Sequence, residues 1–189
     1  MSWCAPPTLL VIDVQKAFDL PDWGPRNNPS AEERIAALLA HWRKRGAPII
    51  HVRHRSVSAD GRFRGAQLEF KPEATPRGVE PVIEKTVNSA FIGTDLEQRL
   101  RATHVSEIVI VGLTTDHCCS TTARMAGNLG FSTFVVADAM ATFARRAPDG
   151  ATIRAETIHR TALASLMDEF ATIVDSNGAM AIVDGCPDA

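Results

Sequence analysis

Short apolar runs alternate with longer amphipathic stretches along the chain. The runs are rich in valine, isoleucine and leucine, which is typical of strands that are covered on both faces. The stretches between them place apolar residues at helical spacing. The pattern predicts six strands, which cover Thr8–Val14, Pro48–His54, Val82–Lys85, Ile108–Leu113, Ser132–Asp138 and Ala171–Val174.

Four helices are predicted between these strands. The first helix has a capping-box pattern at Ser30 and Glu33. A turn over Asp138–Thr142 is expected after the fifth strand. The tail from Asn177 is expected to fray. Repeated strand–helix order predicts a three-layer α/β/α fold with right-handed crossovers and a doubly wound, mostly parallel sheet of about six strands, the first of them central. The helices are expected over residues 30–46, 94–101, from the turn at 114–117 to Asn128–Gly130, and 155–170.

Composition narrows the class of protein. The chain has 189 residues, 45% of them hydrophobic, which suffices for one domain spanning residues 1–189. The net charge is -2 and the basic residues are scattered, so we expect no nucleic-acid partner. No apolar run is long enough to cross a membrane, and the start MSWCAPPTLL lacks the features of a signal peptide. We therefore expect a cytoplasmic protein whose four cysteines are reduced.

The stretch EIVIVGLTTDHCCSTTARMAGNLGF, residues 107–131, organises the rest of the chain. It predicts a buried strand, a tight polar turn and a helix with Thr115 or Asp116 as N-cap. Cys118 then lies in the first turn, beside free N–H groups and the positive end of the helix dipole. Both features favour the thiolate, so we expect the pKa of Cys118 to fall. The same N–H groups could hold an oxyanion.

Two adjacent cysteines make the choice of nucleophile a question of helix faces. Cys119 shares an apolar stripe with Ala123, Ala126 and Leu129, so we expect it in the core. Cys118 points about 100° away from that stripe, and we expect it to be the reactive thiol. The alternative from this stretch alone is that both thiols are buried in the core.

Three groups with complementary chemistry fall at the carboxyl ends of predicted strands. They are Asp13, Lys85 and Cys118, and in a doubly wound sheet such ends share one edge. A thiolate attacks a carbonyl carbon, a carboxylate carries the proton, and an ammonium keeps the carboxylate charged and favours the thiolate. Taken singly, Asp13 could cap a turn and Lys85 could be a solvated charge.

Other polar and aromatic residues have weaker signals. His51 and His54 are three apart on a strand and face opposite sides, so they cannot readily share a metal ion; one of them could hydrogen-bond near the site. Phe18 and Trp23, in and before a proline-rich loop, could wall a pocket or cover the core. The excursion over Ser56–Gly78 is expected to shape the pocket or a subunit contact.

Three segments carry a resemblance to a known family. LLVIDVQKAF, EKTVNSAF and IVGLTTDHCCSTTARMAGNLGF, the last followed by VVADAMATF, resemble the isochorismatase-like cysteine hydrolases, a superfamily that includes nicotinamidases and N-carbamoylsarcosine amidase. The resemblance implies a catalytic triad of Asp13, Lys85 and Cys118. It also implies a cis peptide bond at Leu113–Thr114 and an oxyanion hole made by the amides of Thr114 and Cys118. We expect Phe18, Trp23 and Phe91 to contact the substrate.

Departures from the family pattern refine the expected reaction. The zinc-dependent nicotinamidases have Asp-x-His after the second strand, whereas this chain has His51-Val-Arg-His54, so we expect no metal and no other cofactor. Isochorismatases proper tend to lack the cysteine nucleophile, which this chain has as Cys118.

We therefore expect hydrolysis of a non-peptide C–N bond in a small amide, carbamoyl compound or ureide through a thioester. The alternatives are vinyl-ether hydrolysis and a thiol redox or sensor protein that uses Cys118 and Cys119. The resemblance also implies a homo-oligomer, a dimer or tetramer.

Overall fold

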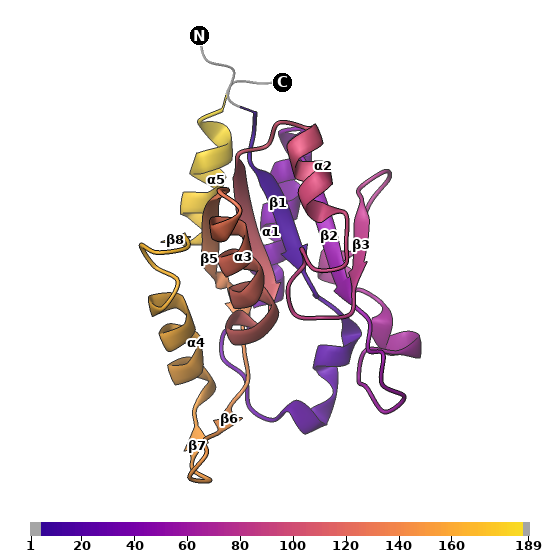
Figure 1. Cartoon of the computed structure of the whole chain (residues 1–189), viewed down its shortest axis with the longest axis vertical. Helices are drawn as coiled ribbons and strands as arrows, with labels where there is room; N and C mark the ends of the chain where they lie inside the picture. The colour runs from indigo at the N-terminus through magenta and orange to yellow at the C-terminus, as the bar shows by residue number, and fades with distance from the viewer. Residues whose placement is uncertain (1–4, 187–189) are drawn as a thin grey trace.

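A single parallel sheet forms the centre of the computed structural model, which describes residues 5–186 (Figure 1). Its six strands have the order β3-β2-β1-β4-β5-β8, with β1 and β4 in the middle. Every pair of neighbouring strands is parallel, so the predicted α/β fold and the central place of the first strand are confirmed. The strands are β1 (Thr8–Ile12), β2 (Ile49–His54), β3 (Val82–Lys85), β4 (Glu107–Leu113), β5 (Ser132–Ala141) and β8 (Thr172–Val174).

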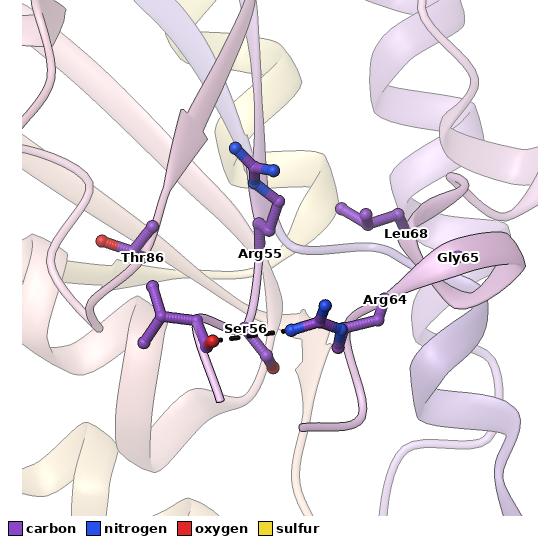
Figure 2. Close-up of a pocket in the computed structure, with 7 residues that line it drawn as sticks. Arg55, Ser56, Arg64, Gly65, Leu68 and Thr86 are labelled. Carbon is purple, nitrogen blue, oxygen red and sulfur yellow. Dashed lines mark hydrogen bonds between the residues drawn. The ribbon is translucent and has the colours of Figure 1, made fainter. Parts of the chain in front are cut away.

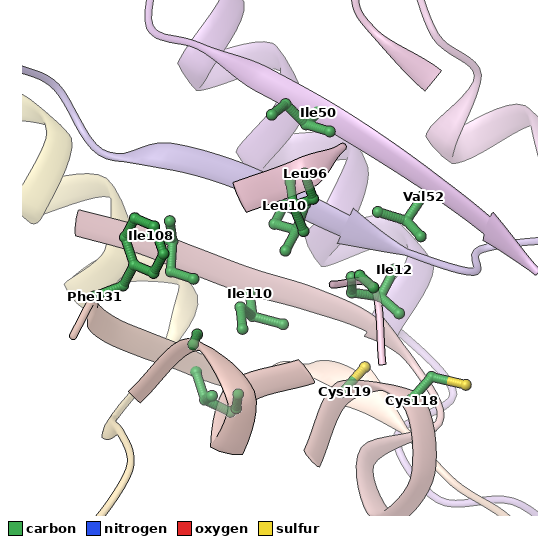
Figure 3. Packing of buried hydrophobic residues seen from close by; sticks show 14 of the residues in the cluster. Leu10, Ile12, Ile50, Val52, Leu96, Ile108, Ile110, Cys118, Cys119 and Phe131 are labelled. Carbon is green, nitrogen blue, oxygen red and sulfur yellow. The ribbon is translucent and has the colours of Figure 1, made fainter. Parts of the chain in front are cut away.

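Helices cover both faces of this sheet because alternate strand residues point to opposite sides. Leu9 and Val11 of β1 pack with α1 (Ala31–Lys44) and α5 (Ser176–Asp184). Leu10 and Ile12 pack on the other face, against α2 (Leu96–Ala102) and α3 (Ser120–Asn128), as Figures 1 and 3 show. The second layer is completed by α4 (Ala155–Ala164), which is followed by the buried Leu166.

Short elements connect the layers. A two-stranded antiparallel ribbon joins β6 (Arg145–Arg146) and β7 (Thr152–Ile153), and four 3₁₀ segments lie at Lys16–Asp19, Pro21–Trp23, Gly65–Leu68 and Pro72–Ala74. Among the helices of residues 5–186, none has both the length and the apolar character that crossing a bilayer requires.

Three elements differ from the sequence-based prediction. The last long helix ends at Ala164 rather than residue 170, since the chain turns there to bury Leu166 and brings the Phe170 backbone against α3. The predicted turn at Asp138–Thr142 is instead a continuation of β5, which pairs with the end of β4 after a register shift. The predicted frayed tail is wrong up to residue 186, because α5 buries an apolar face and is capped by Asp175, which accepts from the Gly178 amide at 2.7 Å.

The capping box predicted at the start of α1 is also absent. Ser30 is the N-cap residue but makes no side-chain hydrogen bond there, and Glu33 is exposed. The neighbouring Glu32 is the buried acid instead. It accepts hydrogen bonds from Arg26 at 2.8 Å and from Lys71 at 2.8 Å, so the first turn of α1 is held by tertiary ion pairs rather than by a local cap.

Gly112 allows β1 and β4 to pair closely just before the turn that carries Cys118. Its φ is +127°, and a Cβ atom there would lie 2.0 Å from the Ile12 carbonyl oxygen. We expect Gly112→Ala to lower the free energy of unfolding by about 3 kcal/mol, since it adds a backbone clash to a strained conformation. Gly130→Ala is the matched control: φ is +84° with open space around the site, so only about 1 kcal/mol is expected. Urea unfolding followed by circular dichroism measures both, and equal losses would contradict the prediction.

Candidate active site

Three strands end at the same edge of the sheet and bring Asp13, Lys85 and Cys118 together. Asp13 follows β1, Lys85 ends β3, and Cys118 lies in the turn after β4. The Lys85 Nζ atom donates to Asp13 Oδ2 at 2.6 Å and to Cys118 Sγ at 3.3 Å. All three side chains are buried: the exposed fractions are 0% for Asp13, 1% for Lys85 and 9% for Cys118. The structure therefore has a triad-like arrangement around one ammonium group.

His54 is the third partner of that ammonium group. Its Nδ1 lies 3.3 Å from Lys85 Nζ, so the three protons of the ammonium meet three acceptors. The Gln15 side chain holds the His54 backbone on both sides, since it accepts from the amide at 2.7 Å and donates to the carbonyl at 3.0 Å. His51 points to the opposite face and bonds Glu80 at 2.9 Å. The prediction that the two histidines face opposite sides, one of them near the site, is confirmed.

The same cluster has the spacing of a metal site. One ligand atom each of Asp13, His54 and Cys118 lie within 4.8 Å of one another. Lys85 donates to all three residues, so a positive charge already stands between them. A metal ion at this point would have to displace the ammonium group. The expectation that the protein uses no metal stays a prediction.

Burial controls the proton affinities in this cluster. Burial raises the pKa of the Cys118 thiol well above its usual value, and the Asp13 carboxylate adds to that effect, while Lys85 opposes it. The expectation of a lowered pKa at Cys118 is thus wrong, since loss of hydration outweighs the helix dipole. Cys118 rests as a thiol and needs a base.

Asp13 can act as that base. Burial raises its pKa above the usual value of a carboxyl, although Lys85 opposes the shift, so Asp13 binds a proton more readily than an exposed aspartate. Its Oδ2 atom is held by Lys85, whereas Oδ1 has no hydrogen-bond partner among the described residues. Burial opposes the charge on Lys85, but Asp13 and Cys118 together outweigh this and keep the pKa of Lys85 above its ordinary value. The lysine therefore remains an ammonium.

The turn that carries Cys118 is tied to distant elements rather than capped locally. Thr115–Cys119 forms one π-helical turn, preceded by a cis Leu113–Thr114 peptide bond as the resemblance implied. The predicted N-cap role of Thr115 or Asp116 is wrong. The Thr115 hydroxyl bonds His159 of α4 at 2.8 Å, and Asp116 accepts from Arg145 at 2.9 Å. These contacts to His159 and Arg145 hold the turn in place, since no side chain caps it locally.

The two cysteines lie as the helix-face argument predicted. Cys119 is fully buried and packs in the cluster that contains Ile12 and Ile110, whereas Cys118 lies at the end of that cluster (Figure 3). Only Cys118 of the two lines the small cavity beside the triad.

That cavity has a volume of about 90 Å³. One wall is aromatic: the ring centroid of Phe18 lies 5.1 Å from that of Trp23 and 5.1 Å from that of Phe63. Phe18 and Trp23 therefore line the cavity beside Cys118, and their contact with a substrate stays a prediction. Phe91 does not, because it stacks on Phe131 at 6.1 Å and packs against the core instead. The lining consists of Phe18, Trp23, His54, Phe63, Asn88, Thr114, His117 and Cys118.

Several lining residues were not singled out from the sequence. Phe63 comes from the Ser56–Gly78 excursion, which was expected to shape the pocket without a named residue. Asn88 and His117 stand inside the motifs EKTVNSAF and TTDHCC, so their closeness to Lys85 and Cys118 was the available signal.

A larger hollow of about 440 Å³ lies beside the same excursion (Figure 2). None of the triad residues lines it. Arg64 reaches across it and donates to the Ser58 carbonyl at 2.9 Å, and Arg55 is paired with Glu84 at 2.7 Å. Both arginines thus have protein partners, and we assign the chemistry to the smaller cavity.

Comparison with known proteins identifies the family that this chain resembles. The family model for the isochorismatase domain matches residues 7–178. The uncharacterized isochorismatase family protein YrdC of Bacillus subtilis is 46% identical over 89% of this chain and 91% of its own length. Streptothricin hydrolase of Streptomyces noursei is 34% identical over 85% of this chain and 59% of its own. The crystal structure of an isochorismatase-family protein from Chromobacterium violaceum has a TM-score of 0.92 and 43% identity, covering 95% of this chain and 94% of the other.

Proposed function

The chain belongs to the isochorismatase family of hydrolases, and we propose that it uses Cys118 to hydrolyse a non-peptide C–N bond in a small amide, carbamoyl compound or ureide. One observation carries the proposal. The Lys85 ammonium contacts both the Asp13 carboxylate, at 2.6 Å, and the Cys118 sulfur, at 3.3 Å. A base, a nucleophile and their common counter-ion therefore share one buried site.

The first step forms a thioester. The Asp13 carboxylate takes the thiol proton, and Cys118 Sγ attacks the carbonyl carbon of the substrate. The negative charge moves from Asp13 to the sulfur without leaving Lys85, which lowers the cost of forming a buried thiolate. The backbone N–H groups of Thr114 and Cys118 stabilise the oxyanion. The C–N bond then breaks, and the proton on Asp13 passes to the leaving nitrogen.

The second step restores the enzyme. Asp13, again a carboxylate, takes a proton from water, and the water oxygen attacks the thioester carbonyl. The C–S bond breaks, the sulfur regains its proton from Asp13, and the acid product leaves. One water molecule is consumed for each C–N bond cleaved.

The thiol redox alternative receives less support from the geometry. Cys119 is fully buried and faces the core, whereas thiol exchange requires access to a partner thiol. The vinyl-ether alternative uses Asp13 without a nucleophilic sulfur, and the two routes separate on the removal of Cys118.

A substrate panel with chemical trapping tests the proposal. Small amides, carbamoyl compounds and ureides are assayed for ammonia or amine release, and the reaction with each active substrate is quenched in acid. We expect peptide mass spectrometry to find an acyl group on Cys118. An acyl group on Cys119, or none on Cys118 with an active substrate, would overturn the assignment.

A further inference from the structure

The most deeply buried residue of α4 is polar. His159 is 5% exposed and Ala155 is 7% exposed, and the other residues of this helix are half-buried or exposed. An apolar side chain would be buried at lower cost, because a buried imidazole gives up its hydration. A buried polar group is therefore expected to make a specific bond. His159 makes that bond to the Thr115 hydroxyl, whose oxygen lies 2.8 Å from Nδ1.

This hydrogen bond joins α4 to the turn that carries the nucleophile. Thr115 is fully buried and is the first residue of the π-helical turn, in which no side chain forms a local cap. Burial lowers the pKa of His159, although Glu156 and Asp116 oppose the shift. The ring is thus neutral at pH 7, and the bond joins two uncharged groups. Its contribution to the site is therefore one of geometry rather than of charge.

The turn decides where the sulfur of Cys118 lies. Asp13 directly follows the central strand β1 and Lys85 is the last residue of β3, so the sheet holds both of them. Cys118 lies instead in the turn after β4, with its sulfur 3.3 Å from Lys85 Nζ. A small shift of the turn lengthens that contact without moving either partner. A misplacement of about 1 Å can lower the rate of a reaction by about 100-fold.

We propose that His159 is a positioning residue: it holds the turn through Thr115 and thereby keeps the sulfur of Cys118 in contact with the ammonium group. This inference rests on the proposed function for its effect on turnover, but not for its effect on the reactivity of the thiol. A buried hydrogen bond between distant elements fixes one arrangement of them, whereas apolar contacts tolerate small displacements. His159 therefore does for the sulfur what the sheet does for Asp13 and Lys85.

Removing both partners of the bond separates positioning from stability. His159→Leu and Thr115→Val each leave the other partner buried and unpaired, so each is expected to lower the midpoint of urea unfolding. The double variant leaves no unpaired group, and we expect its midpoint to lie above that of either single variant. In all three we expect kcat to stay roughly tenfold or more below the wild type, with KM changed by less than about threefold, because the turn is not anchored. A kcat that recovers together with the midpoint would overturn the inference.

Conservative variants and a buried control accompany this test. Thr115→Ser keeps the hydroxyl, so we expect kcat within about threefold of the wild type. His159→Asn places a side-chain amide near the position of Nδ1, and we expect its kcat to exceed that of His159→Leu. Thr133→Val is the matched control, since it removes a hydroxyl that is also buried and donates to the Phe131 carbonyl at 3.1 Å. A loss of kcat in Thr133→Val as large as that in Thr115→Val would overturn the inference, because it would trace the loss to stability.

Alkylation of Cys118 keeps the inference separate from the proposed function. Lys85→Met removes the counter-ion of the thiolate and is expected to slow alkylation by iodoacetamide. That effect is measured in the wild-type background and in His159→Leu, and we expect it to be several-fold smaller in His159→Leu, where the sulfur has left the ammonium group. If no compound of the substrate panel is hydrolysed but this coupling is found, the inference stands while the reaction needs revision. An effect of equal size in both backgrounds would overturn the inference and leave the cysteine mechanism untouched.

Discussion

Replacing Cys118 with alanine is expected to lower the rate of C–N hydrolysis by roughly 10⁴-fold or more, because no other group at this site can form the thioester. Cys118 is the only one of the two adjacent cysteines that lines the cavity. Its neighbours in the cluster, Asp13 and Lys85, already contact each other at 2.6 Å, so removal of the sulfur leaves the ion pair in place. The measurement is kcat/KM for the best substrate of the panel, with circular dichroism to establish that the variant is folded.

Cys119→Ala is the matched control for that experiment. It also removes one sulfur atom, but from the next residue, whose side chain is fully buried in the core. We expect it to lower stability, since it leaves a small cavity, while kcat/KM falls by less than about threefold. Retention of C–N hydrolysis in Cys118→Ala would refute the thioester route. A loss of activity in Cys119→Ala as large as that in Cys118→Ala would contradict the assignment of the nucleophile.

Replacing Lys85 with methionine is expected to lower kcat by roughly 10³-fold while the fold is kept. Methionine fills similar space but carries no charge. Without the ammonium, nothing offsets the effect of burial, so the pKa of Asp13 rises further and a smaller fraction of the carboxyl is ionised and able to act as a base. The buried thiolate also loses its counter-ion. The measurements are kcat and the pH dependence of Cys118 alkylation by iodoacetamide, and we expect alkylation to be slower than in the wild type at every pH near neutrality.

Lys71→Met distinguishes this electrostatic role from the general cost of removing a buried lysine. Lys71 is also buried and is paired with carboxylates, Glu32 at 2.8 Å and Asp19 at 2.5 Å. It does not line the cavity of Cys118. We expect Lys71→Met to lower the midpoint of urea unfolding but to leave the alkylation rate of Cys118 close to that of the wild type. Equal effects of the two substitutions on alkylation would mean that Lys85 acts only through stability.

The positions of the strands could be predicted from the local sequence pattern, whereas the ends of the helices could not. The β-branched apolar runs predicted all six strands of the main sheet, because such residues favour a pleated backbone and are buried wherever the sheet has helices on both faces. Helix ends depend on where the chain must turn to bury a side chain. The last long helix therefore stops at Ala164 so that Leu166 can be buried, and the tail forms α5 because its apolar face has a sheet to cover.

Most residues of the candidate site could be predicted from the sequence, whereas the side chains that surround them could not. Asp13, Lys85 and Cys118 could be grouped from the sequence because the carboxyl ends of parallel strands meet at one edge. The contact of His54 with Lys85 depends on the register of β2 against β3, which pairs these two residues. Phe91 was expected at the substrate but faces Phe131, since its neighbours in space come from a distant segment.

The sequence by itself determined the order of strands and helices, the meeting of Asp13, Lys85 and Cys118 at one edge of the sheet, and the helix face on which each of the two adjacent thiols lies. Each of these depends on the position of residues along a strand or helix. Tertiary structure alone decided the proton affinity of Cys118, the contact of His54 with Lys85 and the aromatic wall of the cavity. The physical reason is that desolvation and hydrogen-bond pairing depend on every atom around a group, and most of those atoms belong to residues far away in the chain.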